Sequence, residues 1–478
     1  MIKLSRRSFL NGLAGTTAAA ALMSVPNVPA LGAVSKVTSI IAKPGTTGLF
    51  GADGNMTDVW AYGGEVPGPV LRVKQGETLK VDLQNELPQK TTIHWHGLRI
   101  KNEMDGVPFL TQKPVGIGQR FTYDFNIQDA GTYWYHPHVN TSEQVGRGLH
   151  GALIVEEQDP VQVDREVVWV LDDWRIQKDG AIAPFGGLHD AAHAGRYGNV
   201  VTINGKTGTP FKVRSGERIR LRLINAANAR IFGLEFEGHE PWRIAIDGHP
   251  VTPAKTGTGP IVIAPGGRID LVIDMTAKAG ETFKIRDRYH NRFAYTLALI
   301  AYSDQKPIRS KPLEAPKKMA ANPVPFPQLG SAERHEMIFQ GGAMGGLRGA
   351  TYKGKEMGLR ELARMGMVWA VNGEVIPPIE EDDIGKPMVS LKKGSSHILR
   401  WRNDTAFAHP IHMHGHSFHL ISRNGTKLFA PLIMDTVLIA PKEYVDVAFV
   451  ADNPGDWALH CHILEHAKSG MMGFVRVG

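Results

Sequence analysis

The sequence predicts an all-β protein that contains three copies of a Greek-key β-sandwich domain. The chain of 478 residues has 53 glycines and 30 prolines, which separate short segments where apolar and polar side chains alternate. Residues 71–85, 211–225 and 389–403 share one pattern, namely a glycine turn, an alternating strand and a final asparagine. A repeat of roughly 150 residues is too long for a solenoid, but it is a suitable length for a β-sandwich domain.

A second shared element closes each copy. Residues 130–136, 279–285 and 454–460 each begin with alanine or proline before a glycine and continue as a short strand. A proline-rich stretch separates the second copy from the third. We therefore predict domains at residues 34–160, 161–305 and 333–478, with a proline-rich linker at residues 306–332.

The N-terminus has the pattern of an export signal. Residues 5–10 carry two consecutive arginines followed by Ser8, Phe9 and Leu10, and a mildly apolar run follows at residues 13–23. We interpret residues 1–33 as a twin-arginine signal peptide and expect a periplasmic protein. No later run reaches the roughly 18 apolar residues that a membrane span needs, so we expect no membrane span.

The charge and the cysteine content of the sequence limit the binding partners and the sources of stability. The net charge of +7 is small, and basic runs with interleaved aromatic residues are missing from the sequence, so we expect no nucleic acid. We expect the protein to be a monomer. Cys461 is the only cysteine, which excludes an intramolecular disulfide, so stability must come from the burial of a core.

Cys461 lies at the centre of the most informative segment. His460 and His462 flank it, His466 follows five residues later and Met471 ten residues later. A thiolate, imidazoles and a weak thioether are the ligands of a blue-copper electron-transfer site. Alternation along the preceding strand directs Cys461 to one side and its two histidine neighbours to the other, so one tripeptide would touch two metal sites. The alternative is a buried free cysteine beside incidental histidines, against which the complete spacing argues.

The repeats align eight histidines in four pairs. Two pairs lie nine and eleven residues beyond the shared asparagine, and two lie five and seven residues beyond the closing glycine. The pairs occupy the same places in the first and third copies: His94, His96, His136, His138, His412, His414, His460 and His462. The second copy has Leu234, Phe236, Ile285 and Asp287 there. Eight imidazoles exceed what one ion can hold, so three copper ions between two facing domains are the simplest solution.

The other histidines outside this register, apart from His409 and His466, are predicted to be surface or structural residues. They are His150, His189, His193, His239, His249, His290, His335, His397, His416 and His419.

Residues 94–97, 136–138, 409–415 and 460–471 resemble the four copper motifs of three-domain multicopper oxidases. The resemblance covers the chain from about residue 40 to its end, and it implies three cupredoxin-like domains and four copper ions. It implies a type 1 copper bound by His409, Cys461, His466 and Met471. It implies a type 2 copper bound by His94 and His412, and a type 3 pair bound by His96, His136, His138, His414, His460 and His462.

The resemblance also implies the reaction. A reducing substrate would give single electrons to the type 1 site, and four electrons passing through Cys461 would reduce O2 to water. Asp105 is placed like an acidic residue that relatives use near the type 2 copper, and its alternative role is an aspartate in a solvated loop turn. Glu465 is a second acidic candidate, and its alternative role is to orient its neighbours.

The expected function is that of a laccase-like or cuprous oxidase that acts in copper tolerance. Three other functions are alternatives. They are a general phenol-oxidising laccase, a copper-free envelope protein of the same fold, and a simple copper carrier. The complete set of ligands argues against the last two. The expected substrates are Cu(I), phenols and aryl amines, with O2 as the acceptor.

A methionine-bearing segment favours Cu(I) as the substrate. Five methionines lie in the third copy before its first repeated strand: Met337, Met344, Met357, Met365 and Met367. Thioethers suit Cu(I), and exported cuprous oxidases of the family resemble this arrangement. We predict a short helix at residues 359–367. The alternative is that these methionines only pack the apolar face of a lid.

Overall fold

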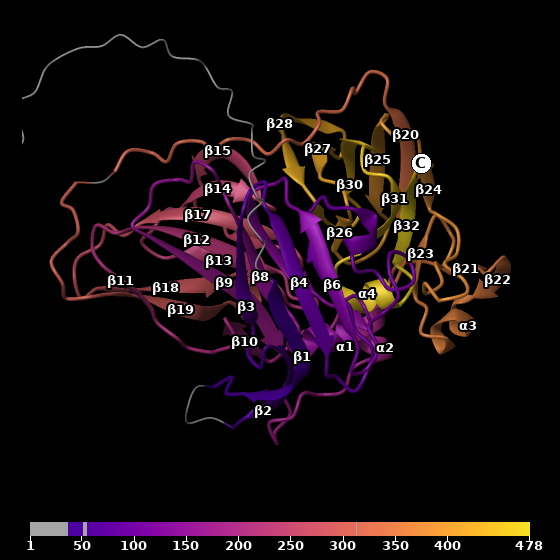
Figure 1. The fold of residues 1–478 in the computed structure, drawn as a ribbon, viewed down its shortest axis with the longest axis horizontal. Helices are drawn as coiled ribbons and strands as arrows, with labels where there is room; N and C mark the ends of the chain where they lie inside the picture. The colour runs from indigo at the N-terminus through magenta and orange to yellow at the C-terminus, as the bar shows by residue number, and fades with distance from the viewer. Residues whose placement is uncertain (1–36, 51–54, 312) are drawn as a thin grey trace, which may run out of the picture. The chain divides into compact units, whose positions relative to one another are not determined.

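The computed structural model describes residues 37–50, 55–311 and 313–478, and it consists of three consecutive pairs of β-sheets. In Figure 1 they run from the indigo strands of the first pair through magenta to the gold strands of the last. The predicted signal peptide at residues 1–33 lies outside the described residues. Among the described residues, no helix is long and apolar enough to cross a membrane.

The first pair contains two four-stranded sheets. The first sheet has the order β2 (Thr57–Tyr62), β1 (Thr38–Thr47), β4 (Thr78–Asn85) and β6 (Arg120–Asn126). The second sheet has the order β3 (Gly68–Lys74), β8 (Gly151–Glu156), β7 (Gly131–His136) and β5 (His94–His96).

The second pair contains a six-stranded and a five-stranded sheet. The larger sheet has the order β10 (Val200–Ile203), β9 (Arg165–Trp174), β12 (Arg218–Asn225), β17 (Arg268–Asp274), β14 (Trp242–Ile246) and β15 (His249–Lys255). The smaller sheet has the order β11 (Phe211–Val213), β19 (Tyr295–Tyr302), β18 (Thr282–Asp287), β13 (Phe232–Phe236) and β16 (Ile261–Ile263).

The third pair repeats the second and adds a hairpin. The larger sheet has the order β23 (Trp369–Val371), β20 (Glu333–Gly341), β25 (Ser396–Asn403), β30 (Tyr444–Val450), β27 (Phe418–Arg423) and β28 (Thr426–Met434). The smaller sheet has the order β24 (Val389–Leu391), β32 (Met472–Val477), β31 (Gly455–Cys461), β26 (His409–Met413) and β29 (Thr436–Ile439). The hairpin is formed by β21 (Gly349–Tyr352) and β22 (Lys355–Gly358).

The repeated strands occupy equivalent places. β4, β12 and β25 each pair in parallel with the first long strand of their own domain. Alternation buries one face of β4, whereas β12 is buried along its whole length. Each domain has its own large cluster of buried apolar residues. The chain is therefore all-β with three cupredoxin-like β-sandwich domains, as the sequence predicted.

The shared asparagine has a structural explanation. Asn85, Asn225 and Asn403 are buried at the ends of their strands. Each side-chain amide donates hydrogen bonds to carbonyl groups on two separate loop or strand segments. Each side-chain oxygen also accepts a hydrogen bond from the backbone two residues later, at 3.0 Å. The asparagine thus fixes the loop that leads to the first histidine pair, which explains the constant spacing.

In the described part of the chain, four short α-helices and two 3-10 helices connect the strands. They are α1 (Thr141–Gly146), α2 (Leu188–Ala192), α3 (Leu359–Arg364), α4 (Leu464–Lys468), and 3-10 turns at Asn102–Met104 and Asn291–Phe293. The predicted helix at residues 359–367 therefore ends three residues early. Gly366 adopts a positive φ of 77°, which no α-helix continues through.

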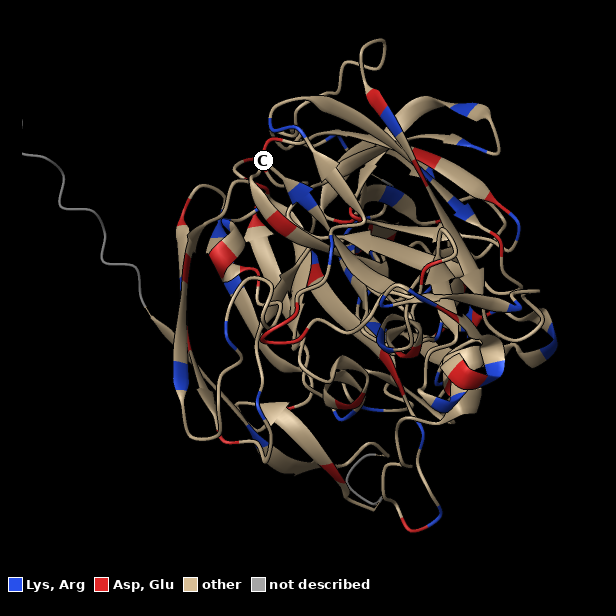
Figure 2. Ribbon diagram, turned by 90° about the vertical axis from the view of Figure 1, so that its right-hand side faces the viewer, with Lys and Arg blue, Asp and Glu red and all other residues tan. Residues whose placement is uncertain are grey.

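Charged residues of both signs are interspersed along the described ribbon (Figure 2). Between β19 and β20, in the proline-rich region, the described residues form no helix or strand.

Candidate metal centres

One centre lies inside the third domain and joins β26, β31 and the helix α4. The Sγ atom of Cys461 lies 3.5 Å from Nδ1 of His409 and 3.7 Å from Nδ1 of His466. The two Nδ1 atoms lie 3.1 Å apart. All three side chains are buried. Met471 is also fully buried, and its backbone bonds to Cys461 and His466 on either side.

The hydrogen bonds around this centre leave both Nδ1 atoms without protons. The Nε2–H of His466 donates to the carbonyl of His193 at 2.7 Å. The Thr405 hydroxyl donates its proton to Asn403 at 2.7 Å, so it accepts from Nε2–H of His409 at 2.9 Å. Two bare lone pairs therefore face each other and a sulfur. Burial lowers the pKa of both imidazoles and raises the pKa of the Cys461 thiol. A cation at this point would remove the repulsion and would hold the thiol as a thiolate, so the donor set fits copper.

The second centre gathers the eight aligned histidines between the first and third domains. All eight are buried. Their ring nitrogens form overlapping groups in which the atoms lie within 4.8 Å of one another, including the groups His94–His96–His136, His94–His412–His414 and His138–His414–His460. Because His94 belongs to two groups, distances alone do not divide the eight histidines among separate ions.

Bare lone pairs also converge in the second centre. Nε2 of His460 lies 3.4 Å from Nε2 of His138 and 3.1 Å from Nε2 of His414. The Nδ1–H of His460 donates to the carbonyl of Cys461 at 2.9 Å, so its Nε2 carries no proton. Ring nitrogens without any hydrogen-bond partner among the described residues include His94 Nε2, His96 Nδ1, His136 Nε2, His412 Nε2 and both nitrogens of His462. A buried, unpaired acceptor is costly, whereas the same acceptor is a good copper ligand.

Asp105 lies beneath two of these histidines. Its carboxylate accepts a hydrogen bond from Nδ1 of His414 at 2.8 Å and lies 3.2 Å from Nδ1 of His94. Its backbone carbonyl accepts from the same atom of His94 at 2.8 Å. Asp105 is fully buried, so the alternative of a solvated loop aspartate is wrong. Its position orients both rings with Nε2 towards the centre.

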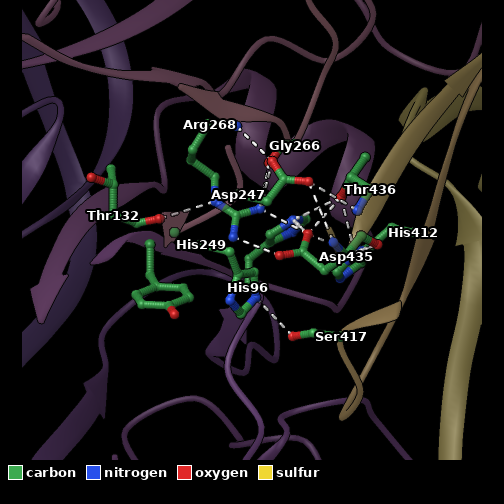
Figure 3. Close-up of polar contacts among 12 residues, drawn as sticks. His96, Thr132, Asp247, His249, Gly266, Arg268, His412, Ser417, Asp435 and Thr436 are labelled. Carbon is green, nitrogen blue, oxygen red and sulfur yellow. Dashed lines mark hydrogen bonds and ion pairs between the residues drawn. The ribbon is translucent and has the colours of Figure 1, made fainter. Parts of the chain in front are cut away.

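Asp435 has the same role on the opposite side, and the sequence analysis missed it. Its Oδ1 atom lies 3.2 Å from Nε2 of His96, and its carbonyl accepts from Nδ1 of His412 at 2.9 Å. Arg268 of the middle domain clamps the Asp435 carboxylate with two hydrogen bonds of 2.8 and 2.6 Å (Figure 3). Burial opposes ionisation, but the charge of Arg268 and these hydrogen bonds hold the pKa of Asp435 well below its usual range.

Asp247 completes this network from the middle domain. Its carboxylate accepts from the backbone N–H groups of Arg268 at 3.0 Å and Thr436 at 3.2 Å (Figure 3). Burial and the charge of Asp435 raise the pKa of Asp247 to about 7. The middle domain therefore contributes no histidine to the centre, yet its residues hold the ligand-orienting carboxylate of the third domain.

Two glycines allow this close packing. At Gly266, a Cβ atom would lie 2.8 Å from the His462 ring and 3.0 Å from the His96 ring. At Gly97, a Cβ atom would meet Arg268 and Asp435. Both glycines also have a positive φ, so any other residue there would strain the backbone and displace the network.

Glu465 lies apart from the rings. Its carboxylate accepts hydrogen bonds from the Asn228 amide at 2.9 Å and the Arg196 N–H at 3.1 Å. Burial raises its pKa. Together with His138 and His460 it lines a cavity of about 700 Å³, whose other walls include Leu188 and Met365.

Of the ten histidines outside the register, several are buried and structural. His150 pairs with Asp172 at 3.0 Å, and His249 bonds to Ser417 at 3.0 Å. His189 and His193 lie at α2 and are discussed below. The backbone carbonyl of His193 is the contact to His466 that no sequence pattern indicated.

The folds and the two buried centres define a copper oxidase of the three-domain class. Family models described as "Multicopper oxidase" match residues 46–160, 165–305 and 363–478. The chain therefore belongs to the multicopper oxidase family, so it is an oxidoreductase with copper as its cofactor.

Individual relatives agree over nearly the whole length. The multicopper oxidase MmcO of Mycobacterium tuberculosis is 29% identical, with 98% of this chain and 96% of the relative covered. The crystal structure of a multi-copper oxidase from Pseudomonas thermotolerans is 34% identical with a TM-score of 0.82, covering 93% of this chain and 100% of that one. A multicopper oxidase from Campylobacter jejuni, described as a metallo-oxidase, is 28% identical with a TM-score of 0.76, covering 92% and 91%.

Proposed function

We propose that this protein couples four one-electron oxidations of Cu(I) to the reduction of O2 to water, and that it acts in copper tolerance. Phenols and aryl amines are secondary substrates. The observation that carries the oxidase proposal is the pair of centres joined by one tripeptide. Cys461 belongs to the mononuclear centre, while the adjacent His460 lies within 3.4 Å of His138 and His414 in the cluster.

The residues are assigned as the family resemblance implies. The type 1 copper takes His409, Cys461, His466 and Met471. The type 2 copper takes His94 and His412, and the type 3 pair takes His96, His136, His138, His414, His460 and His462. When bound, the four ions supply one-electron acceptance at the first centre and four-electron reduction of O2 at the second.

The protein's own groups prepare both centres. Asp105 and Asp435 fix the tautomers of four histidines, so that neutral nitrogens face the ions. We propose Asp105 and Glu465 as the acidic groups that supply protons. Support for Glu465 is its raised pKa and its place in the cavity that reaches His138 and His460. This cavity is our candidate route for O2.

The methionine segment supports Cu(I) only in part. Met337 and Met367 are buried in two different apolar clusters, and Met357 packs against the cluster of Met367, so these three fit the packing alternative. Met344 and Met365 are exposed by 80% and 45% of their surfaces, so two thioethers are available to a soft cation. The description of the Campylobacter jejuni relative as a metallo-oxidase favours the same choice.

Export to the periplasm by the twin-arginine route belongs to this proposal, because copper tolerance requires oxidation outside the cytoplasm. Its support is the arginine pair at the N-terminus.

The test compares two substrates on one copper-loaded preparation. We expect O2 consumption with both Cu(I) and a simple phenol, with a kcat/KM for Cu(I) at least about tenfold higher, a difference of about 1.4 kcal/mol in activation free energy. A higher kcat/KM for the phenol would favour the general laccase. A protein that consumes no O2 with either substrate would favour a copper carrier or a structural protein.

A second experiment separates the two centres. His94→Ala and His412→Ala should leave reduction of the blue chromophore by substrate intact, because neither ring touches Cys461. Reoxidation by O2 should slow by at least about a hundredfold, because the cluster loses a ligand. Stopped-flow absorption measures both steps. His239→Ala, whose ring bonds to Tyr302 far along the middle domain, is the control. Reoxidation at the parental rate in either cluster variant would show that the assignment is wrong.

A further inference from the structure

The mononuclear centre is closed towards solvent by the end of α2 from the middle domain. Three successive carbonyl groups there accept hydrogen bonds from the third domain: Ala191 from the Trp369 indole at 2.8 Å, Ala192 from the Ala343 N–H at 2.7 Å, and His193 from the His466 imidazole at 2.7 Å. These carbonyls lie at a helix C-terminus, where the helix itself cannot satisfy them.

This closure determines what a reductant can reach. The outer nitrogen of His466 is already bonded to the His193 carbonyl, so it has no hydrogen bond to offer a substrate. Trp369 covers the ring, with its centroid 4.4 Å away. A short route from the surface to His466 begins at the side chain of His193 and continues through its own carbonyl and a 2.7 Å hydrogen bond.

A second imidazole lies against the side chain of His193. His189 lies four residues earlier on α2, and the two imidazoles stack with centroids 4.1 Å apart and an angle of 12°. His193 follows the last residue of α2, and its backbone N–H still donates to the carbonyl of His189 at 3.1 Å, which keeps both side chains on one side of the helix end. His189 is exposed and His193 is half-buried, so a solvated ion can reach them.

The protonation of the pair suits a cation. Nδ1–H of His193 donates to the carbonyl of His189 at 2.9 Å, which leaves Nε2 as a bare acceptor. The ring of His189 has no hydrogen bond among the described residues, so either nitrogen is free to bind. The stacked ring planes are nearly parallel, so a shared ion requires the exposed ring of His189 to rotate towards Nε2 of His193.

The segment that contacts the end of α2 carries an exposed thioether. Ala343, which bonds to Ala192, is followed by Met344, whose side chain is 80% exposed. Met344 has a positive φ of 61°, an uncommon and strained conformation for a residue other than glycine. Imidazole nitrogens with a soft sulfur suit copper and match Cu(I) better than harder cations.

We propose that His189 and His193 bind the substrate Cu(I) ion at the surface, with Met344 as an additional soft ligand, and that His193 is the point at which this ion delivers its electron. This inference rests on the proposed function, and it names the site where that function takes its substrate. The bound Cu(I) loses one electron and leaves as Cu(II), with no bond made or broken except to its ligands. The electron passes along His193 to His466, and O2 is the final oxidant.

The first test measures binding without turnover. Ag(I), a redox-inert analogue of Cu(I), is titrated calorimetrically into the copper-loaded protein. We expect one exchangeable site in the parent, and at least a tenfold weaker Kd in His189→Gln, in His193→Gln and, to a smaller extent, in Met344→Leu. His290→Gln, which changes an exposed histidine of the same domain, is the matched control. Unchanged stoichiometry and Kd in both histidine variants would overturn the site.

The second test measures how Cu(I) delivers its electron to the mononuclear centre. Glutamine at position 193 keeps the backbone carbonyl, so the blue absorption band should stay unchanged. The KM for Cu(I) should rise about tenfold, while kcat/KM for a phenol stays within twofold. An unchanged KM for Cu(I), or an equal loss for the phenol, would overturn the entry role. A parent that oxidises phenol but not Cu(I) would refute the proposed function and the entry role, and Ag(I) binding would still decide the site.

Discussion

Replacing Cys461 with serine is expected to abolish the blue absorption and to reduce O2 consumption to background, while the fold remains. The thiol faces two bare imidazole nitrogens at 3.5 and 3.7 Å, and a serine hydroxyl is a hard, weakly acidic group that does not replace a thiolate. The cysteine is also the covalent link between the two centres. Absorption spectra, copper content and O2 electrode traces measure the loss.

Stability should change little in this variant. Sulfur and oxygen differ by a small volume, and the site stays buried, so we expect a loss of about 1–2 kcal/mol in the free energy of unfolding. Met471→Leu is the matched comparison. It should keep the colour and raise the reduction potential, because the thioether tunes the centre and does not build it. A serine variant that stayed blue would falsify the assignment of Cys461.

The sequence predicted this centre because its signals are local. Cys461, His466 and Met471 lie within eleven residues, whereas His409 lies 52 positions from Cys461 and was assigned through the family resemblance. The cluster histidines were found through the repeat, since the buried asparagine of each copy sets a fixed distance to the first histidine pair. The fold class followed from the same repeats.

The supporting groups could not be found in this way. Arg268 and Asp435 are 167 positions apart, and no spacing rule connects them. The middle domain has no aligned histidine, so only the tertiary structure reveals that Arg268 on β17 contacts the residues around the cluster. His193 acts through a backbone carbonyl, which every residue possesses. The methionines looked equivalent in sequence, but Met337 and Met367 are buried while Met344 is exposed, and tertiary packing alone decides this.

Replacing Arg268 with methionine is expected to have the largest effect on stability. Arg268 is fully buried and offers two hydrogen bonds to Asp435, one of 3.2 Å to the Thr132 carbonyl and one of 3.2 Å to the Gly266 carbonyl (Figure 3). Methionine replaces only the aliphatic part of the arginine side chain and carries no charge, so it leaves the carboxylates of Asp435 and Asp247 buried together. Breaking a buried ion pair by removing one partner costs about 3–5 kcal/mol.

The same change should disturb the cluster in a way that a stability loss alone does not. Without its clamp, Asp435 no longer fixes His96 and His412, so reoxidation by O2 should slow about tenfold or more. Reduction of the blue chromophore should keep its rate, because the mononuclear centre is held by other contacts. Stopped-flow absorption after a single reduction separates the two steps. A shift in the electron paramagnetic resonance signal of the type 2 copper reports the same disturbance.

Two further variants isolate the cause. Arg268→Met combined with Asp247→Asn removes one of the two facing carboxylates, so part of the lost stability should return while reoxidation stays slow. Arg288→Met, which breaks an exposed pair with Glu235 in the same domain, should cost no more than about 1 kcal/mol and leave both kinetic steps unchanged. Reoxidation of Arg268→Met at the parental rate would show that the arginine stabilises only the contact between the domains. Asp435 would then orient His96 and His412 without help from Arg268.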